Sequence, residues 1–199
     1  MKRGGAVVAL IALLGAAMVA ALYQVSRPMI EQRRDLAAER RLLDLLPPSL
    51  YDNRPLQAPV VLPADARLGT SGTEPAYLAM RDGQPSAVLL PVHAKGYEGP
   101  IHLLVAIAPD GRLLASKALA QQETPGLAAL DEAGPRHWMR QLAGQRIEDG
   151  PAAWTLRTDG GEIDAIAGAT ITSRAVLQAI EGALMFFDAE RATLLEPRP

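Results

Sequence analysis

Two stretches of sequence decide the fold: AYLAMRDGQPSAVLLPV at residues 76–92 and IHLLVAIAPDGRLLASKAL at residues 101–119. Each contains two apolar runs of strand length with a turn signal between them, Asp82-Gly83 in the first and Pro109-Asp110-Gly111 in the second. Such a signal between apolar runs is typical of a β-hairpin, because glycine, aspartate and proline favour the backbone angles of tight turns. We therefore expect four strands, at residues 76–80, 86–92, 101–108 and 113–119.

Helical patterns follow these strands in the sequence. Apolar residues recur at helical spacing from about Thr172 to Glu190, and Gly134-Pro135 opens a shorter helix with Trp138 on its apolar side. A further strand is expected at residues 153–157, where a glycine turn ends it. Strand hairpins followed by helices predict an α+β fold, in which antiparallel strands pack with helices.

The N-terminal segment from Ala6 to Tyr23 is apolar and carries no charge. As a helix it spans about 27 Å, near the minimum for the hydrocarbon core of a bilayer. We predict a single N-terminal transmembrane helix; the alternative is a cleaved signal peptide with Lys2 and Arg3 as its basic start. The apolar run exceeds that of a usual signal peptide, which favours the retained anchor. Basic residues lie on both sides of the segment, so the charge count leaves the orientation open.

Changes in composition divide the chain into five parts. A charged, leucine-bearing stretch ended by Pro47-Pro48 predicts an amphipathic helix beyond the membrane, either a docking surface or a solvated spacer. The proline-rich stretch after it lacks periodicity, so we expect a linker or meander. The predicted parts are a transmembrane anchor (1–25), a juxtamembrane amphipathic helix (26–48), a linker (49–75), the main domain (76–191) and a C-terminal tail (192–199).

The composition excludes several classes of function. A formal net charge of −2 and an aromatic content of 4% do not favour a nucleic-acid partner. The sequence has no cysteine, which excludes disulfides, iron–sulfur clusters and thiolate metal sites. Any electron chemistry must therefore use an organic cofactor or a metal without thiolate ligands.

The histidines and tryptophans give no clear signal of a site. His93, His102 and His137 share no ligand spacing, so we expect surface or structural histidines and no metal site. Trp138 and Trp154 are expected in the core, with stacking on a cofactor as the alternative.

The segment DAIAGATITS, residues 164–173, directly precedes the last predicted helix. Gly168 and Ala169 have almost no side chain, so a bulky group can approach the backbone there. Thr172 or Ser173 is expected to cap the helix, whose free N–H groups and positive dipole end favour an anion. A phosphate beside Thr170 would suit this environment. These features alone do not distinguish a phosphate site from an ordinary capped turn.

The same segment resembles the flavinylation motif D-x-x-[S/T]-G-A-T of the FMN-binding domain family. That family includes the G subunit of the Rnf electron-transport complex and the C subunit of the sodium-pumping NADH:quinone oxidoreductase. In it, the threonine of the GAT triplet is joined to FMN by a phosphodiester that a separate flavin transferase makes from FAD. The resemblance assigns this role to Thr170, with Asp164, Gly168 and Ala169 completing the motif. Ala167 departs from the pattern, in which Ser or Thr is usual.

A second segment, QQETPGLA at residues 121–128, resembles the E-T-P-G-L-G stretch that lines the flavin pocket in this family. The resemblance implies that Glu123 and Thr124 offer polar partners to the flavin, and that the following Pro-Gly turn leaves room for it. GYEGPI at residues 96–101 is a weaker similarity, and Ala128 replaces the family's last glycine. The residues expected around FMN are Asp164, Gly168, Ala169, Thr170 and Thr172 from the first segment, with Glu123, Thr124, Gly126 and Leu127 from the second.

The length, the short anchor and the motif spacing resemble the Rnf G subunit more than the longer C subunit. The resemblance implies an electron-relay subunit that carries FMN in a redox-driven translocase, not a stand-alone enzyme. The complex would couple electron transfer from the ferredoxin or NADH side to the movement of Na⁺ or H⁺. The other Rnf subunits and a flavin transferase are the implied partners. The implied location is the bacterial inner membrane, with the flavin domain (76–191) on the periplasmic side.

Two alternatives stay open at this point. The first alternative is a membrane-anchored binding or assembly module without redox function. The second is a flavinylated subunit of a different membrane redox system.

Overall fold

The computed structural model describes residues 15, 18, 23, 42–72, 74–124, 130 and 138–197. The chain divides into two compact units, residues 1–43 and residues 44–199, and each is described by itself. In the first unit, Gly15, Met18 and Tyr23 are helical. Most of the predicted anchor at 6–23, and residues 26–41 of the predicted amphipathic helix, lie outside the described residues. Among the residues that are described, none belongs to a helix with both the length and the apolar character needed to cross a bilayer.

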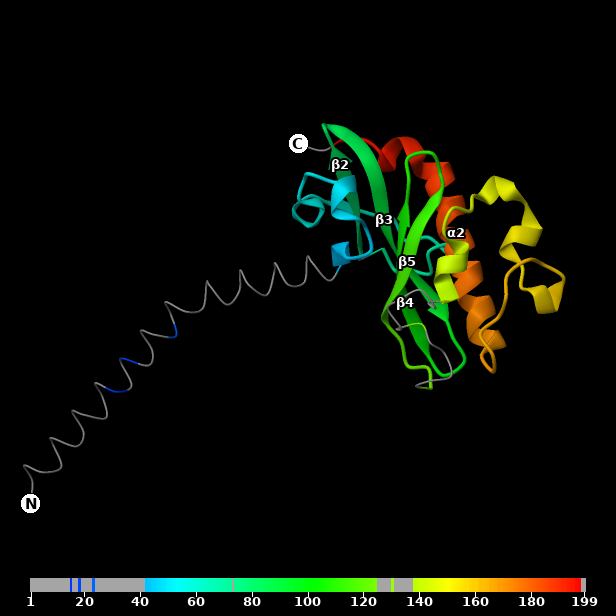
Figure 1. The fold of residues 1–199 in the computed structure, drawn as a ribbon. Helices are drawn as coiled ribbons and strands as arrows, with labels where there is room; N and C mark the ends of the chain where they lie inside the picture. The colour runs from blue at the N-terminus through cyan, green and yellow to red at the C-terminus, as the bar shows by residue number, and fades with distance from the viewer. Residues whose placement is uncertain are drawn as a thin grey trace, which may run out of the picture. The chain divides into compact units, whose positions relative to one another are not determined.

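The second unit contains a five-stranded antiparallel sheet in which the strands follow one another in sequence order (Figure 1). Each strand therefore pairs with its neighbours along the chain, as expected for successive hairpins. The strands are β1 (Pro59–Val61), β2 (Pro75–Arg81), β3 (Gln84–Lys95), β4 (Pro100–Ile107) and β5 (Leu113–Ala120).

The two predicted hairpins are confirmed, and with them the α+β class. Asp82 and Gly83 have φ values of 51° and 74° and form the two-residue turn between β2 and β3. Positive φ at both central positions is the geometry that matches the twist of the flanking strands. Arg81 and Gln84 pair across this turn, which sets the register of the hairpin.

The stretch 49–75, predicted as a linker or meander, is instead part of the folded unit. It supplies β1, which pairs with β2 at the edge of the sheet, and it places Val60, Leu62 and Leu68 in the core. Periodicity did not predict these core residues, because the prolines of this stretch interrupt the regular alternation that indicates a strand.

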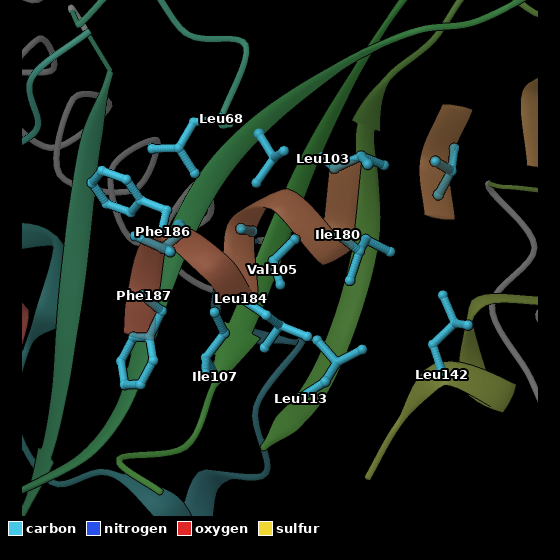
Figure 2. Packing of buried hydrophobic residues seen from close by; sticks show 14 of the residues in the cluster. Leu68, Leu103, Val105, Ile107, Leu113, Leu142, Ile180, Leu184, Phe186 and Phe187 are labelled. Carbon is cyan, nitrogen blue, oxygen red and sulfur yellow. The ribbon is translucent and has the colours of Figure 1, made fainter. Parts of the chain in front are cut away.

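Helix α2 (Thr170–Leu194) covers one face of the sheet and supplies the largest share of the core (Figure 1). Figure 2 shows Ile180, Leu184 and Phe187 of α2 gathered against Leu103 and Ile107 of β4. All five side chains are buried in one hydrophobic cluster. Burying a large apolar side chain stabilises the fold by about 1.5–3 kcal/mol, so this packing fixes where the start of α2 lies relative to the sheet.

The segment between the sheet and α2 differs from expectation. The predicted strand at 153–157 is wrong: Pro151–Trp154 form the 3₁₀ helix η5, and Leu156 makes only an isolated parallel bridge to Ile163. Pro151 occupies the first position of η5, where its fixed φ favours a helical turn. Trp154 lies in the core, as predicted.

Five further 3₁₀ helices are present in the described parts of the chain. The described part of the predicted helix after Gly134-Pro135 is η3, in which Met139 and Leu142 are buried. These five helices are η1 (Pro48–Leu50), η2 (Pro55–Gln57), η3 (Trp138–Leu142), η4 (Ile147–Asp149) and η6 (Arg157–Asp159).

Candidate functional site

A cavity of about 360 Å³ opens beside the start of α2. Its lining comes from three segments that are far apart in the sequence: the β3–β4 loop, the chain after β5, and the turn into α2. The two segments predicted to share one pocket therefore do meet. The lining residues are Tyr97, Glu98, Glu123, Thr124, Gly168, Ala169, Thr170, Ile171 and Thr172.

Glu123 joins these three segments. Its side chain is buried, and the Thr172 hydroxyl donates a hydrogen bond of 2.5 Å to its Oε2. Its other oxygen, Oε1, accepts a hydrogen bond of 3.1 Å from the backbone N–H of Glu98. A buried carboxylate is tolerated only when donors satisfy both oxygens, so Glu123 holds the loop and the helix together.

Gly96 leaves room for this carboxylate. A Cβ at position 96 would lie 2.2 Å from Oε1 of Glu123, far inside van der Waals contact. A side chain at this position would displace Glu123 from its hydrogen bonds. The glycine at position 96 is therefore required by the place that the Glu123 carboxylate occupies in this chain.

The mouth of the cavity is more exposed than its base. Tyr97 is 72% exposed and Ile171 is 53% exposed, and the Thr124 hydroxyl donates a hydrogen bond to the exposed carboxylate of Glu98. Ile171 was missed by the sequence argument. In the sequence, Ile171 is simply an apolar residue next to the GAT triplet. Its exposure at the cavity follows only from the folded structure.

A tight turn carries the GAT triplet into α2. The Ala169 N–H donates to the Ile166 carbonyl at 3.0 Å, and Gly168 has a φ of +80°. This positive φ is the reason for glycine, since other residues rarely adopt it without strain. The Ser173 hydroxyl fastens the turn: it accepts from the Ile166 N–H and donates to the Ala169 carbonyl, each at 2.9 Å.

The predicted helix cap is wrong. The helix begins at Thr170, its N-cap residue is Ala169, and no side chain caps it. Thr172 and Ser173 lie within the first turn, where buried hydrogen bonds occupy their hydroxyls. The first-turn N–H groups of an α-helix have no partner within the helix, so this end of α2 favours an anion at the cavity.

Thr170 also lines a second cavity, of about 550 Å³, together with Arg157, Asp164, Ala167 and Gly168. The Arg157 Nε–H donates to Oδ1 of Asp164 at 2.8 Å. The carbonyl of Asp164 accepts from the side chains of Trp138 and Gln141, which fixes the position of this residue. Asp164 thus anchors the start of the segment 164–173 and takes no part in lining the first cavity.

The sequence comparisons agree with this geometry. Residues 96–185 match the FMN-binding domain family. The G subunit of the ion-translocating oxidoreductase complex from Pseudomonas aeruginosa (strain UCBPP-PA14) is 42% identical, covering 99% of this chain and 93% of that protein. Its counterpart from Vibrio cholerae serotype O1 (strain M66-2) is 36% identical, covering 100% of this chain and 96% of that protein. The chain belongs to the family of G subunits of ion-translocating oxidoreductase complexes.

A solved structure is also similar to this chain. NqrC of Shewanella oneidensis is 23% identical, with a TM-score of 0.49, over 76% of this chain and 75% of that chain.

Within this member of the G-subunit family, the first cavity brings together Glu123, Thr124, Gly168, Ala169, Thr170 and Thr172, six of the residues expected around FMN. Gly126 and Leu127 lie outside the described residues. Arg174, which suits a phosphate by its charge, instead makes a two-pronged ion pair with Asp159 at 2.8 and 2.9 Å.

Proposed function

We propose that this chain is the FMN-carrying electron-transfer subunit of a membrane complex that couples electron flow to the translocation of Na⁺ or H⁺. Membership in the G-subunit family and the match to the FMN-binding domain family support this function. The observation that carries it to particular residues is the cavity beside Thr170, lined by both sequence motifs.

The residues present fit FMN in size and charge. The cavity of about 360 Å³ lies within the range of roughly 300–1,000 Å³ usual for small-molecule sites. The uncapped start of α2 supplies N–H groups and a positive dipole end where a phosphate would lie. Gly168 and Ala169 leave the backbone open for close approach at the same place.

We infer that FMN is attached covalently to Thr170. Three hydroxyls begin α2, and two of them are committed: Thr172 is 1% exposed, Ser173 is 0% exposed, and both are hydrogen-bonded. Thr170 is partly exposed, and no described residue shares a hydrogen bond with its hydroxyl. A transferase can therefore reach this hydroxyl without breaking buried hydrogen bonds. Its oxygen would bond to the FMN phosphorus of FAD, AMP would leave, and the hydroxyl proton would be released.

The protein side chains set the environment of the cofactor. FMN itself supplies reversible electron transfer when it is bound. The carboxylates of Glu123 and Glu98 lie at the same cavity and disfavour the build-up of negative charge there. In this proposal they lower the potential of the cofactor, while Thr172 and the β3–β4 loop hold Glu123 in place.

The remaining assignments extend the same proposal. Residues 6–23 would anchor the chain in the bacterial inner membrane, and the domain would lie on the periplasmic side. The partners would be the other subunits of the Rnf-type complex and a flavin transferase. A covalent bond suits a cofactor outside the cytoplasm, because a lost FMN could not easily be replaced there.

Mass spectrometry of the full-length chain, purified from cells with an active transferase, tests the attachment. The Thr170 peptide should carry the mass of FMN as a phosphodiester, and the denatured chain should fluoresce on a gel. Thr170→Val keeps the shape of the side chain and removes the hydroxyl, so it should abolish both signals. Thr193→Val, at an exposed position near the other end of α2, is the matched control and should leave them unchanged.

An unmodified Thr170 peptide from such cells would overturn the covalent attachment. If FMN were also absent from the native preparation, a non-redox binding module would become the better interpretation.

A further inference from the structure

Two of the three histidines meet in the folded chain, on the face of the sheet turned away from α2. His93 of β3 and His102 of β4 are directly opposite each other in the strand register. Their neighbours Val92 and Leu103 belong to the core cluster under α2, and side chains alternate between faces along a strand. Their spacing in the sequence did not predict that they meet, because spacing along the chain takes no account of pairing between strands.

The two rings lie close together, and a carboxylate lies beside them. The ring centroids of His93 and His102 are 4.1 Å apart, with an angle of 56° between the ring planes. Glu74, directly before β2, places Oε2 2.7 Å from Nε2 of His93. One ligand atom from each of the three residues lies within 4.8 Å of the other two. All three side chains are half-buried.

We propose that Glu74, His93 and His102 bind one divalent transition-metal cation, with Zn²⁺ as the representative ion. Two imidazole nitrogens and one carboxylate oxygen form a donor set that suits Zn²⁺ and its neighbours rather than Mg²⁺ or Ca²⁺. Three protein ligands leave one position of a tetrahedral site for water. The site is therefore of the open type, distinct from a closed structural zinc site.

The arrangement needs only small adjustments to hold the ion. With metal–ligand bonds of about 2.0–2.1 Å, tetrahedral donors lie about 3.4 Å apart. Side-chain rotation can close the remaining gap, because the backbone already fixes His93 and His102 as a cross-strand pair. The pairing of β3 with β4 thus already orders both histidines before the ion binds, so little conformational entropy is lost on binding.

The Glu74–His93 contact alone does not satisfy the cluster. Oε2 of Glu74 is buried, and despite the short distance to His93 no residue in the described part of the chain gives it a hydrogen bond. A buried carboxylate oxygen without a donor is costly, and a cation removes that cost.

An opening lies beside His93, one of the three residues of the cluster. A cavity of about 550 Å³ is lined by Gly69, His93 and the loop from Ala94 to Pro100. The lining includes Tyr97 and Glu98, which also line the cavity beside Thr170. The proposed ion would therefore lie next to a loop that the proposed flavin site shares, although the metal site itself does not depend on FMN.

Binding of Zn²⁺ to the full-length chain tests the proposal. The chain would be purified with a histidine-free tag, stripped with a chelator, dialysed against micromolar Zn²⁺, and analysed for metal content. We expect one tightly bound Zn²⁺ per chain. Glu74→Gln, His93→Gln and His102→Gln should each weaken Zn²⁺ binding at least tenfold, whereas His137→Gln is the matched control and should bind as the parent does.

An X-ray absorption spectrum of the unmutated, zinc-loaded chain keeps the test independent of whether the variants fold. Two imidazole ligands in the spectrum would support the site, as would their loss in a folded His102→Gln variant. Less than one Zn²⁺ per chain at micromolar concentration, or a shell without two imidazoles, would overturn it. Equal loss of binding in His137→Gln would do the same.

Discussion

The hydroxyl of Thr172 donates a hydrogen bond of 2.5 Å to Oε2 of Glu123, a residue 49 positions earlier in the sequence. Both side chains are buried, and both line the cavity beside Thr170. This single contact ties the chain after β5 to the first turn of α2. It therefore links the stability of the domain to the shape of the proposed flavin site.

Thr172→Val should destabilise the domain by about 1–3 kcal/mol, because it keeps the volume of the side chain but leaves a buried carboxylate oxygen without its donor. Denaturant unfolding of the parent and the variant measures the change. Thr193→Val, at an exposed position of α2, is the control and should change the free energy of unfolding by less than about 0.5 kcal/mol. Equal effects of the two substitutions would show that the hydrogen bond to Glu123 contributes no stability.

Gly168→Ala should lower stability by about 1–2 kcal/mol, since alanine at a φ of +80° is strained. The same substitution should also reduce the fraction of chains that carry FMN, because the turn before Thr170 would have to move. Gly144→Ala is the matched control: its φ is +94°, and no atom lies within 4 Å of a Cβ built there. It should lose similar stability without losing FMN. A parallel loss of FMN in both variants would attribute the effect to folding alone.

Gly182→Ala in the middle of α2 places two effects in competition. Alanine favours a helix over glycine by about 1 kcal/mol. A Cβ at position 182, however, would lie 2.5 Å from the backbone carbonyl oxygen of Arg67. Overpacking against a fixed backbone costs about 1–3 kcal/mol, so we expect net destabilisation. A higher denaturant midpoint for Gly182→Ala than for the parent would mean that the backbone at Arg67 moves aside at little cost in free energy.

Asp65→Asn should make the stability of the domain less dependent on acid pH. The side-chain hydrogen bonds from Arg67 lower the pKa of Asp65 below its usual 3.8, against the opposing effect of burial. Such a carboxyl stabilises the fold above pH 3.8, and this contribution disappears as the pH falls towards its lower folded-state pKa. The Arg67 side chain is 37% exposed, so the contribution is about 1 kcal/mol or less.

Unfolding midpoints of the parent and Asp65→Asn, measured between pH 7 and pH 2.5, check this expectation. The difference in unfolding midpoint between the parent and Asp65→Asn should stay constant down to about pH 5 and become smaller below about pH 4. In a chain that carries Arg67→Lys, the change in unfolding midpoint caused by Asp65→Asn should also be smaller, because lysine cannot make the two-pronged contact. Parallel profiles over the whole pH range would contradict the assignment.

Local features made much of the fold predictable. The Asp82-Gly83 turn and the apolar runs around it specify a hairpin through backbone preference and alternation, and these act within a few residues. The failed prediction at 153–157 has the same origin. Apolar residues there serve a 3₁₀ turn that buries Trp154, and periodicity over so short a run does not distinguish the two structures.

The sequence by itself determined the four main strands and the last helix, and its resemblance to a family predicted a site at Thr170 and the segment around Glu123. Only the tertiary structure decided that Thr172 is a buried partner of Glu123 rather than a helix cap, and that His93 faces His102. The physical reason is range. Turn and helix preferences act between neighbours in the chain, whereas hydrogen bonds to a buried carboxylate and cross-strand pairs depend on which distant segments the hydrophobic core brings together.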